Sequence, residues 1–413
     1  MRAGAVVCGA GIAGISTAFH LTRAGVTDVV VVDPRPPLSL TSDKSTECFR
    51  NWWPQPAMAA LMNRSIDLLE QYSVESDDAF HLKRQGYLYV TGERLRLAAL
   101  AQEGDAASDL QARVYDAAEL SRRFPFLTPT AAGGLHALRA GWFSAQQLGA
   151  WMLTMADFEV VQGAVTGVVT SRGRVSRVVI DGESAIETPT FVNAAGPMVA
   201  SVGQLLDIEL PVLHEVHLKV GFRDYQQVVP RGAPMLIWID PQVLDWSEQE
   251  QANLDEAGRS ELLGQLPGGC HGRPEGDADS SWVLALWEYH RRIQEPVWPL
   301  PQDRLYPEVV MKGMTTMIPG LSVYRDRLPQ PVVDGGYYTK TRENFPLIGP
   351  LPVPGAYIVG ALSGFGVMAA AAAGELAALH ITGGDLPSYA GTLALSRYGD
   401  PAYRPTASDQ GQI

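Results

Sequence analysis

The sequence of 413 residues predicts an α/β fold made of two interleaved domains. Three observations support this prediction. The chain begins with a short apolar run, a glycine-rich turn, a helical segment and a second apolar run, which is the order of a βαβ unit. Its middle contains short β-rich runs separated by turns, and its last third contains a strand, a small-residue loop and an alanine-rich helix. Because a chain of this length exceeds a single hydrophobic core, a second domain built on antiparallel strands is expected.

The βαβ unit spans residues 6–33 and contains glycines spaced as G-x-G-x-x-G. In this pattern Gly9 permits a tight turn, Gly11 lets the backbone approach a pyrophosphate, and Gly14 lets the helix pack on the strand. The helix is predicted over residues 15–24, and its N-terminal N–H groups point toward the phosphate. These residues predict a Rossmann-like unit that binds a dinucleotide.

Asp33 ends the second valine-rich strand, 19 residues after Gly14. A carboxylate at this position accepts hydrogen bonds from the adenosine ribose of a dinucleotide. Because the strand, glycines, helix, second strand and acid follow in the required order, the motif is more specific than an isolated G-x-G-x-x-G. The alternative is a nucleotide-free unit whose glycines serve only for packing.

Composition and charge narrow the class of protein. The chain has 46% hydrophobic and 19% charged residues, which is ordinary for a soluble globular protein, and we expect no apolar run long enough to span a bilayer. The net charge of −13 argues against nucleic acid or an anionic membrane surface as a partner. The first strand begins almost at Met1, which predicts no signal peptide and a cytoplasmic location. Cys8, Cys48 and Cys270 lack the spacing of disulfides or a metal site, as in a reducing compartment.

After the second strand, a polar segment turns abruptly aromatic at Trp52 and Trp53. We expect residues 41–54 to thread between a cofactor and a substrate cavity, because a solvated loop has little use for adjacent tryptophans. Ser144 is the expected N-cap of a later helix. Periodicity predicts helices at residues 56–72, 95–103, 117–124 and 145–155, and a strand at 86–90.

The middle of the chain is richer in β patterns. Three runs at residues 158–161, 164–169 and 175–180 predict a small antiparallel meander. It leads to a buried strand that ends in Asn193-Ala194-Ala195-Gly196, followed by a helix. Beyond it we expect strands at residues 215–222, 235–239 and 282–287, an acidic helix at 246–266 and a glycine-rich surface loop at 268–280.

The last third begins with a helix predicted at residues 304–317. Residues 335–350 then form a strand, a polar turn and a short apolar piece, and a further strand is expected at 357–360. The small-residue loop at 361–368 opens an alanine-rich helix at 369–379, whose N-terminus is a second potential anion site.

Five of these stretches together resemble the D-amino-acid oxidase and sarcosine oxidase superfamily of FAD-dependent oxidoreductases, over nearly the whole chain. They are the fingerprint ending at Asp33, the Ser45-Thr46 region, the meander ending in residues 192–196, Phe345-Pro346-Leu347-Ile348-Gly349, and Ser363-Gly364-Phe365-Gly366. Within the superfamily the chain looks closest to the sarcosine oxidase β-subunit and dimethylglycine dehydrogenase side. The resemblance implies a Rossmann-like FAD-binding domain at residues 1–82, 143–212 and 336–413, interleaved with an antiparallel-sheet substrate domain at 83–142 and 213–335.

The resemblance also implies extended, non-covalently bound FAD. The fingerprint glycines would hold the pyrophosphate, and losing the hydrogen bonds that the Asp33 carboxylate accepts from the ribose would cost about 1.5–3 kcal/mol of FAD binding. The second helix N-terminus would stabilise negative charge at the flavin's pyrimidine edge. The implied cofactor residues are Gly9, Gly11, Ile12, Ala13, Gly14, Asp33, Pro34, Lys44, Ser45, Thr46, Val165, Ala195, Gly196, Arg342, Gly364, Phe365, Gly366, Val367 and Met368.

The chemistry that the resemblance implies is oxidation of a C–N bond. A hydride passes to flavin N5 from the carbon next to the nitrogen of an amino acid or of a secondary or N-methyl amine, and water hydrolyses the resulting imine. The protein then needs a cation for a substrate carboxylate and a cage for the amine, but no strong base. The electron acceptor would be O2 or a separate carrier.

Four residues are expected to act on the substrate, namely Arg50, Tyr338, Lys340 and His217. Arg50 falls where sarcosine oxidases place an arginine, and its planar fork suits a carboxylate. Lys340 could supply a further cation, Tyr338 a wall of the cage, and His217 an acid or base. For each of them the alternative is a structural role, as an exposed or ion-paired cation or in core packing.

The chain departs from the family pattern at two positions. A lysine that often follows the C-terminal S-G-x-G is replaced by Met368, and a lysine that assists oxygen activation in monomeric sarcosine oxidases is replaced near Ala285. These departures argue against simple sarcosine as the substrate and leave a dehydrogenase open beside an oxidase. Two further hypotheses stay open, namely a 2-hydroxy-acid oxidase or dehydrogenase and a flavin-binding subunit with little turnover.

Further hypotheses concern reactive side chains. Cys48 falls near the expected flavin, but it matches no attachment motif, so a buried thiol is favoured over a covalent link to FAD. His214 and His217 lie close together in the sequence without an HExxH pattern or a third ligand, so no metal site is expected. An NADPH-dependent monooxygenase is disfavoured, since the chain has no second dinucleotide fingerprint.

Overall fold

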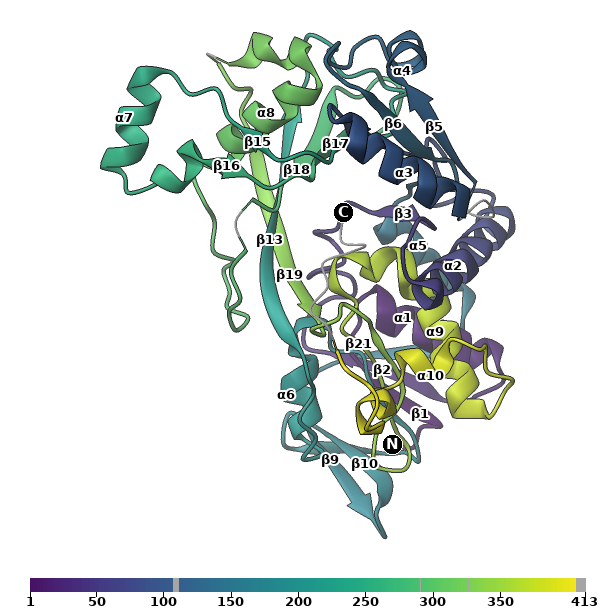
Figure 1. Ribbon diagram of the computed structural model, residues 1–413. Coiled ribbons are helices and arrows are strands. Elements are labelled where there is room, and N and C mark those ends of the chain that lie inside the picture. Colours follow the sequence, from purple (N-terminus) through teal and green to yellow (C-terminus); the bar gives the residue numbers. More distant parts are fainter. Residues whose placement is uncertain (107–110, 290, 326, 406–413) are drawn as a thin grey trace.

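The computed structural model describes residues 1–106, 111–289, 291–325 and 327–405. Within these ranges, a six-stranded sheet of order β20-β21-β12-β1-β2-β8 lies next to an eight-stranded sheet of order β19-β13-β18-β17-β14-β4-β6-β5 (Figure 1). The first sheet is largely parallel and the second largely antiparallel. The predicted mixed α/β fold is thereby confirmed.

The six-stranded sheet is built around the predicted βαβ unit. Neighbouring strands in it run parallel, except for the antiparallel pair β20 and β21. Because side chains alternate along a strand, Val7 and Val31 face a layer of helices, whereas Val6 and Val30 face a smaller sheet. Its strands are β1 (Ala5–Cys8), β2 (Val29–Asp33), β8 (Phe158–Gln162), β12 (Phe191–Asn193), β20 (Leu347–Pro350) and β21 (Ala356–Gly360).

Helices cover one face of this sheet and a small sheet covers the other. The helical layer consists of α1 (Ile12–Arg23), α5 (Ala145–Met155), α9 (Gly366–Thr382) and α2 (Pro56–Glu75). On the opposite face lie α6 (Val199–Gln204) and the antiparallel strands β9 (Val165–Ser171), β10 (Arg174–Ile180) and β11 (Ser184–Glu187). Ser144 caps α5 as predicted, since its hydroxyl accepts a hydrogen bond from the Gln147 N–H.

The alanine-rich helix α9 packs closely on α1. A Cβ added to Gly374 would lie 2.5 Å from Oγ of Ser16, so small residues are needed where the two helices meet. The segment Ser363–Thr382 is nevertheless long and apolar enough to cross a membrane, and the expectation that no such run exists was wrong by that measure. Because 67% of its apolar window is buried inside the protein, this segment is weak evidence for a membrane span.

The eight-stranded sheet forms the second layer. All its neighbouring strands are antiparallel except β14 and β4. A core with α8 (Tyr306–Met317) lies on its outer face. Its strands are β4 (Tyr87–Thr91), β5 (Ala112–Asp116), β6 (Gly133–Ala137), β13 (Leu213–Arg223), β14 (Met235–Trp238), β17 (Cys270–Glu275), β18 (Trp282–Leu286) and β19 (Val332–Lys340).

Shorter elements complete the described structure. The strands β3 (Cys48–Arg50) and β7 (Ala140–Trp142) form one two-stranded sheet, and β15 (Gln242–Val243) and β16 (Gln265–Leu266) form another. The remaining α-helices of the described residues are α3 (Arg94–Ala106), α4 (Ala117–Arg123), α7 (Glu248–Glu256) and α10 (Ala390–Leu393). The predicted domain boundaries stay a prediction.

Two long strands connect the layers. β13 and β19 pair from Leu213 opposite Lys340 to Gly221 opposite Val332. Figure 1 shows them running from the eight-stranded sheet past α6, to the side of the six-stranded sheet. At the close approach of the two strands, a Cβ on Gly335 would lie 2.1 Å from the carbonyl oxygen of His217. The pair therefore carries side chains of the eight-stranded sheet toward the carboxyl ends of the parallel strands.

Two sequence predictions in this region were wrong. β8 does not belong to the meander but pairs in parallel with β2, and β11 is the third strand of the small sheet. Runs that follow one another in sequence suggest a meander, but the pattern within a strand does not show which neighbour the strand pairs with. Likewise, only Glu248–Glu256 of the predicted acidic helix is α-helical.

The predicted surface loop at 268–280 was wrong as well, because its first half forms the buried strand β17 in the middle of the sheet. Its glycine content misled the prediction. A Cβ on Gly272 would lie 2.7 Å from the Leu284 carbonyl oxygen and 2.8 Å from Cε of Met314, so glycine here permits close packing. Glycines also lie within the strands β6 and β7.

The buried β17 makes a testable prediction through Arg273, whose side chain is fully buried. Its guanidinium donates hydrogen bonds to the Thr46 carbonyl at 2.7 and 3.2 Å and lies over the Trp142 ring. Replacing Arg273 by Met should lower the free energy of unfolding in urea by about 2–4 kcal/mol, because buried donors and packing are lost. The matched control Arg174→Met, on an exposed position of β10, should stay within about 0.5 kcal/mol. Equal stability of the two variants would contradict the buried placement.

Candidate cofactor and active site

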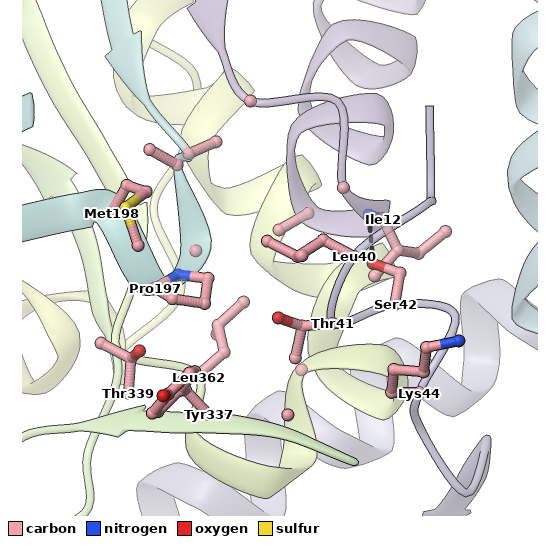
Figure 2. Close-up of a pocket in the computed structure, with 18 of the residues that line it drawn as sticks. Ile12, Leu40, Thr41, Ser42, Lys44, Pro197, Met198, Tyr337, Thr339 and Leu362 are labelled. Atoms are coloured by element: carbon pink, nitrogen blue, oxygen red, sulfur yellow. Dashed lines mark hydrogen bonds between the residues drawn. The ribbon is translucent and has the colours of Figure 1, made fainter. Parts of the chain in front are cut away.

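A cavity of about 370 Å³ lies where the two sheets meet. Its wall combines residues at the carboxyl ends of β1, β2, β12 and β21 with residues 38–42 and 44–46 and with parts of β13 and β19. Figure 2 shows Ser42 and Lys44 on one side of this cavity and Pro197 and Thr339 on the other. In α/β proteins ligands bind at the carboxyl ends of the parallel strands, which is the position of this cavity.

The fingerprint glycines lie at one end of the cavity. Gly9 has φ of 113°, which glycine adopts without strain, and Gly9 and Gly11 both line the wall. Gly14 lies outside the wall, where a Cβ would come 1.9 Å from the Gly9 carbonyl oxygen. The N-terminus of α1 opens on the cavity, and its Ile12 N–H donates to Oγ of Ser42 at 3.0 Å (Figure 2). Ala13 also lines the wall.

Asp33 lines the cavity at the end of β2, together with Pro34. One carboxylate oxygen accepts a hydrogen bond from the Ala10 N–H and the other from the Arg35 N–H, both at 2.8 Å. These bonds hold the carboxylate in one orientation, and each oxygen keeps a second lone pair for a further donor. This orientation suits the hydroxyl groups of a ribose.

Cations of the eight-stranded sheet hold the segment with Lys44, Ser45 and Thr46, all three of which line the cavity. Nζ of Lys219 donates to the Ser45 carbonyl at 2.9 Å and lies 3.5 Å from Asp334. Lys44 pairs with Asp43 and lies 3.7 Å from the same Asp334. The wall therefore contains Lys219, a cation that the sequence analysis did not select.

A second helix N-terminus, that of α9, closes the far end of the cavity. Gly364, Gly366 and Val367 line the wall, and a Cβ on Gly364 would lie 2.4 Å from the Tyr338 ring. Phe365 and Met368 point away into the core, where Phe365 packs edge-on against Trp53. On the other side, the predicted cofactor residues Val165, Ala195 and Gly196 also line the wall.

Among the four predicted substrate residues, Tyr338 and His217 line the cavity. Their rings stack with centroids 3.6 Å apart and an angle of 13°. Nε2 of His217 lies 3.3 Å from a carboxylate oxygen of Glu215, and Nδ1 lies 2.9 Å from one of Glu288. Lys340 lies 2.9 Å from the other oxygen of Glu215. Lys340, Glu215, His217 and Glu288 therefore form a continuous chain of charges, which we call the β13 charge chain.

Electrostatics favour the ionised forms along this chain. Burial acts to raise the pKa of Glu215, but hydrogen bonds from His217 and Lys340 lower it to about 2. Burial likewise acts to lower the pKa of His217, but Glu288 and Glu215 raise it. The pKa of Glu288 is lowered, because the nearby His217 outweighs burial. The β13 charge chain thus contains two cations, Lys340 and His217, and two carboxylates, Glu215 and Glu288, all of them largely buried.

A protein-family model described as FAD dependent oxidoreductase (DAO) matches residues 5–379. The chain belongs to the DAO family. The predicted FAD cofactor and the oxidoreductase class are therefore confirmed at the level of the family. No curated protein sequence matches the chain significantly.

Solved structures share the DAO fold of this chain at low sequence identity. L-proline dehydrogenase from P. horikoshii is 20% identical with a TM-score of 0.77, and the match covers 96% of each chain. Glycine oxidase from Geobacillus kaustophilus is 13% identical with a TM-score of 0.77 and covers 96% of this chain and 99% of that chain. Iminodiacetate oxidase from Chelativorans sp. BNC1 is 18% identical with a TM-score of 0.73 and covers 94% and 98%.

The cavity of this DAO-family protein suits FAD on its own geometry. Glycine positions leave no room for a Cβ beside the turn, N–H groups of α1 open on the wall, and an oriented carboxylate stands at the end of β2. The wall then continues without interruption to the second helix N-terminus at α9. An extended dinucleotide requires two separated ends of this kind.

Three predicted polar residues lie outside the cavity wall. Arg50 is 2% exposed, stacks over the Trp53 ring at 4.5 Å and donates to the Trp52 carbonyl. Lys340 is buried in the β13 charge chain, and Arg342 is exposed on the turn after β19. The roles of Arg50, Lys340 and Arg342 stay predictions, because none of the three side chains lines the cavity.

Cys48 also lies outside the wall. Its thiol donates to the Thr46 carbonyl at 3.2 Å, and burial raises its pKa, as in an unreactive thiol. Among the described residues, no group of three or more His, Cys, Asp or Glu side chains is arranged to hold a metal ion.

Sequence reasoning missed Ser42, Lys219, Glu215 and Glu288. Glu215, His217 and Lys219 alternate along β13 and therefore share one face, which the period of two could have indicated. Ser42 and Glu288 carried no such signal, because their contacts come from distant parts of the chain.

The geometry at β2 predicts the effect of Asp33→Asn on cofactor binding. The amide cannot accept with both of its terminal atoms, so FAD should bind about tenfold to a hundredfold more weakly, consistent with about 1.5–3 kcal/mol for hydrogen bonds to a charged group. Titration of the apoprotein with FAD, followed by flavin fluorescence, measures the change. The control Asp28→Asn lies on an exposed position just before the same strand and should bind FAD like the parent. Unchanged binding in Asp33→Asn would contradict the ribose role.

Proposed function

We propose that this protein oxidises the C–N bond of an amino acid or of a secondary or N-methyl amine. FAD bound in the cavity supplies the acceptor for a hydride from the carbon next to nitrogen, and the resulting imine is hydrolysed by water. The observation that carries the proposal is the wall itself, which joins the fingerprint of the parallel sheet to the stacked pair His217 and Tyr338 of the antiparallel sheet. A substrate at that junction would lie between the cofactor and the part of the wall that β13 and β19 form, which we call the roof of the cavity.

The residues that would hold FAD follow from their places in the wall. Gly9, Gly11 and Ile12 would hold the pyrophosphate at the N-terminus of α1, and Asp33 the ribose. Gly364 and Gly366 would meet the ring system at the N-terminus of α9, whose partial positive charge favours an electron-rich ring.

The substrate would be held chiefly by polar groups of the roof. Tyr338 presents an aromatic surface to the cavity, which suits an amine or an alkyl group. A cation would bind the carboxylate of the substrate. The sequence analysis selected Arg50 for this role, whereas Lys219 is a cation that lines the cavity. Orientation of the reacting carbon, rather than proton abstraction, is then the main task of the protein.

The names of the structural neighbours support the amine class. L-proline, glycine and iminodiacetate each carry an amine nitrogen on a carbon next to a carboxylate. We also propose placement near the sarcosine oxidase β-subunit side of the family, a cytoplasmic location, and O2 or a separate carrier as electron acceptor. The changed residues Met368 and Ala285 motivate the dehydrogenase form of this proposal.

An anaerobic visible spectrum tests the proposed function. The FAD-loaded protein is mixed with a panel of N-methyl amino acids, D- and L-amino acids, L-proline and 2-hydroxy acids, and then exposed to air. We expect one amine class to bleach the flavin absorbance. Recovery in air would indicate an oxidase, and persistence of the bleached form would indicate a dehydrogenase with a separate acceptor.

Three results would contradict the proposal. Bleaching by hydroxy acids alone would indicate a 2-hydroxy-acid enzyme, and no bleaching by any compound would favour a flavin-binding subunit. Failure to bind FAD would overturn the site itself. With a bleaching substrate in hand, the variants Arg50→Met and Lys219→Met identify the carboxylate partner, since loss of that cation should raise the substrate concentration for half-bleaching about tenfold or more.

A further inference from the structure

The β13 charge chain uses both nitrogens of His217. The side chains of His217, Glu215, Glu288 and Lys340 are between 4% and 12% exposed, so water competes little for these contacts. A neutral imidazole has a single N–H, and its other nitrogen would direct a lone pair at one of the two carboxylates. An imidazolium donates to both of them, and it is the form that satisfies this geometry.

Charge balance supports the same form. Glu215 has two cationic neighbours, Lys340 and His217, while Glu288 has His217 at 2.9 Å and Arg291 at 4.0 Å. If His217 were neutral, Glu288 would be a buried carboxylate with its nearest partner uncharged, which is costly in a low-dielectric place.

Tyr338 completes the arrangement. Its ring lies parallel to His217 at 3.6 Å and contacts Gly364 at the start of the segment leading into α9. A cation over the face of a tyrosine ring attracts it electrostatically, and the attraction is stronger when water is excluded. His217 thus connects the carboxylates to an aromatic wall of the cavity, while neither of its nitrogens is left to take a proton from a substrate.

We propose that Glu215 and Glu288 hold His217 as a permanent imidazolium, which acts as the positioning residue for Tyr338 and not as an acid or base. The placement of Tyr338 against FAD and substrate rests on the proposed function, but the charge of His217 does not. The titratable and charged groups around His217 lie on its own strand and on the neighbouring elements. They are Glu215 and Lys219 of β13, Glu288 and Arg291 after β18, His271 of β17, and Tyr338 and Lys340 of β19.

Of these groups, the carboxylates dominate. Burial lowers the pKa of His271, so this neighbour adds little positive charge near neutral pH. Burial raises the pKa of Tyr338, so its hydroxyl stays protonated. Because the pKa of His217 is raised in the folded protein, the stability from its contacts is complete below the ordinary histidine pKa of about 6.5 and is lost only as pH rises through the raised value.

The charge of His217 can be read by NMR of the histidine rings. The protein has eight histidines, and the signal that disappears in His217→Phe identifies the ring of interest. In the parent, with FAD bound, we expect this signal to keep its imidazolium position as pH rises through the ordinary histidine pKa of about 6.5. In Glu288→Gln it should titrate at lower pH than in the parent, because one of the two carboxylates that raise the pKa of His217 is gone.

A matched control replaces a buried carboxylate that does not touch the chain. Asp240 is 4% exposed and accepts hydrogen bonds from the Thr91 hydroxyl and the Gly92 N–H. Asp240→Asn should leave the His217 signal unchanged. The proposal is overturned by a parent signal that titrates near 6.5 or by a Glu288→Gln signal that does not move. The parent titration alone decides the matter if the Glu288 variant does not fold.

A double-substitution cycle tests the positioning role. His217→Gln and Tyr338→Ala should each weaken FAD binding about tenfold, and the double variant should be within about twofold of the weaker single variant, because both remove one connected contact. Independent effects, about a hundredfold in the double variant, would refute the connection. The pair His217→Gln and Asp240→Asn serves as the control cycle and should combine independently. If the parent binds no FAD, the proposed function fails, whereas the NMR titration of the apoprotein still tests the charge of His217.

Discussion

Pairing of β13 with β19 is the constraint on which the site depends. The two strands pair over the whole length of β19, and the same strands reach from the eight-stranded sheet to the carboxyl ends of the parallel strands. Backbone hydrogen bonds along a ladder fix the register, and a shift by one residue would turn every side chain to the opposite face. The register is therefore what places Glu215 opposite Tyr338 and brings His217 to the cavity.

A second constraint is the burial of charged side chains beside β13 and β19. Lys340, Glu215, His217 and Glu288 are buried together, and none would be stable there without the next. Such a chain adds little to the free energy of unfolding, but it fixes one arrangement of the side chains, because each partner satisfies hydrogen-bonding atoms of its neighbour. Fixed polar groups of this kind suit a site in which orientation, and not proton transfer, is the task of the protein.

Much of the fold was predictable where the local pattern and the tertiary role agree. The βαβ unit, α2, α5 and α9 follow from periodicity, glycine positions and a capping serine, which act over a few residues. The failures have one cause. β17 contains glycine because Leu284 and Met314 approach its backbone, and β8 pairs with β2, a strand far earlier in the chain. Neither contact is visible within the segment itself.

The sequence by itself determined the dinucleotide fingerprint, the acid at the end of β2, the small-residue helix start before α9 and hence the FAD-dependent class, because each of these features needs particular residues at fixed short spacing. Only the tertiary structure decided the roof of the cavity. Lys219 reaches the Ser45 carbonyl and Glu288 reaches His217 across strands far apart in the chain, whereas Arg50 is buried beside Trp53 and away from the wall. Contacts between distant segments depend on strand register and burial, which short-range patterns do not encode.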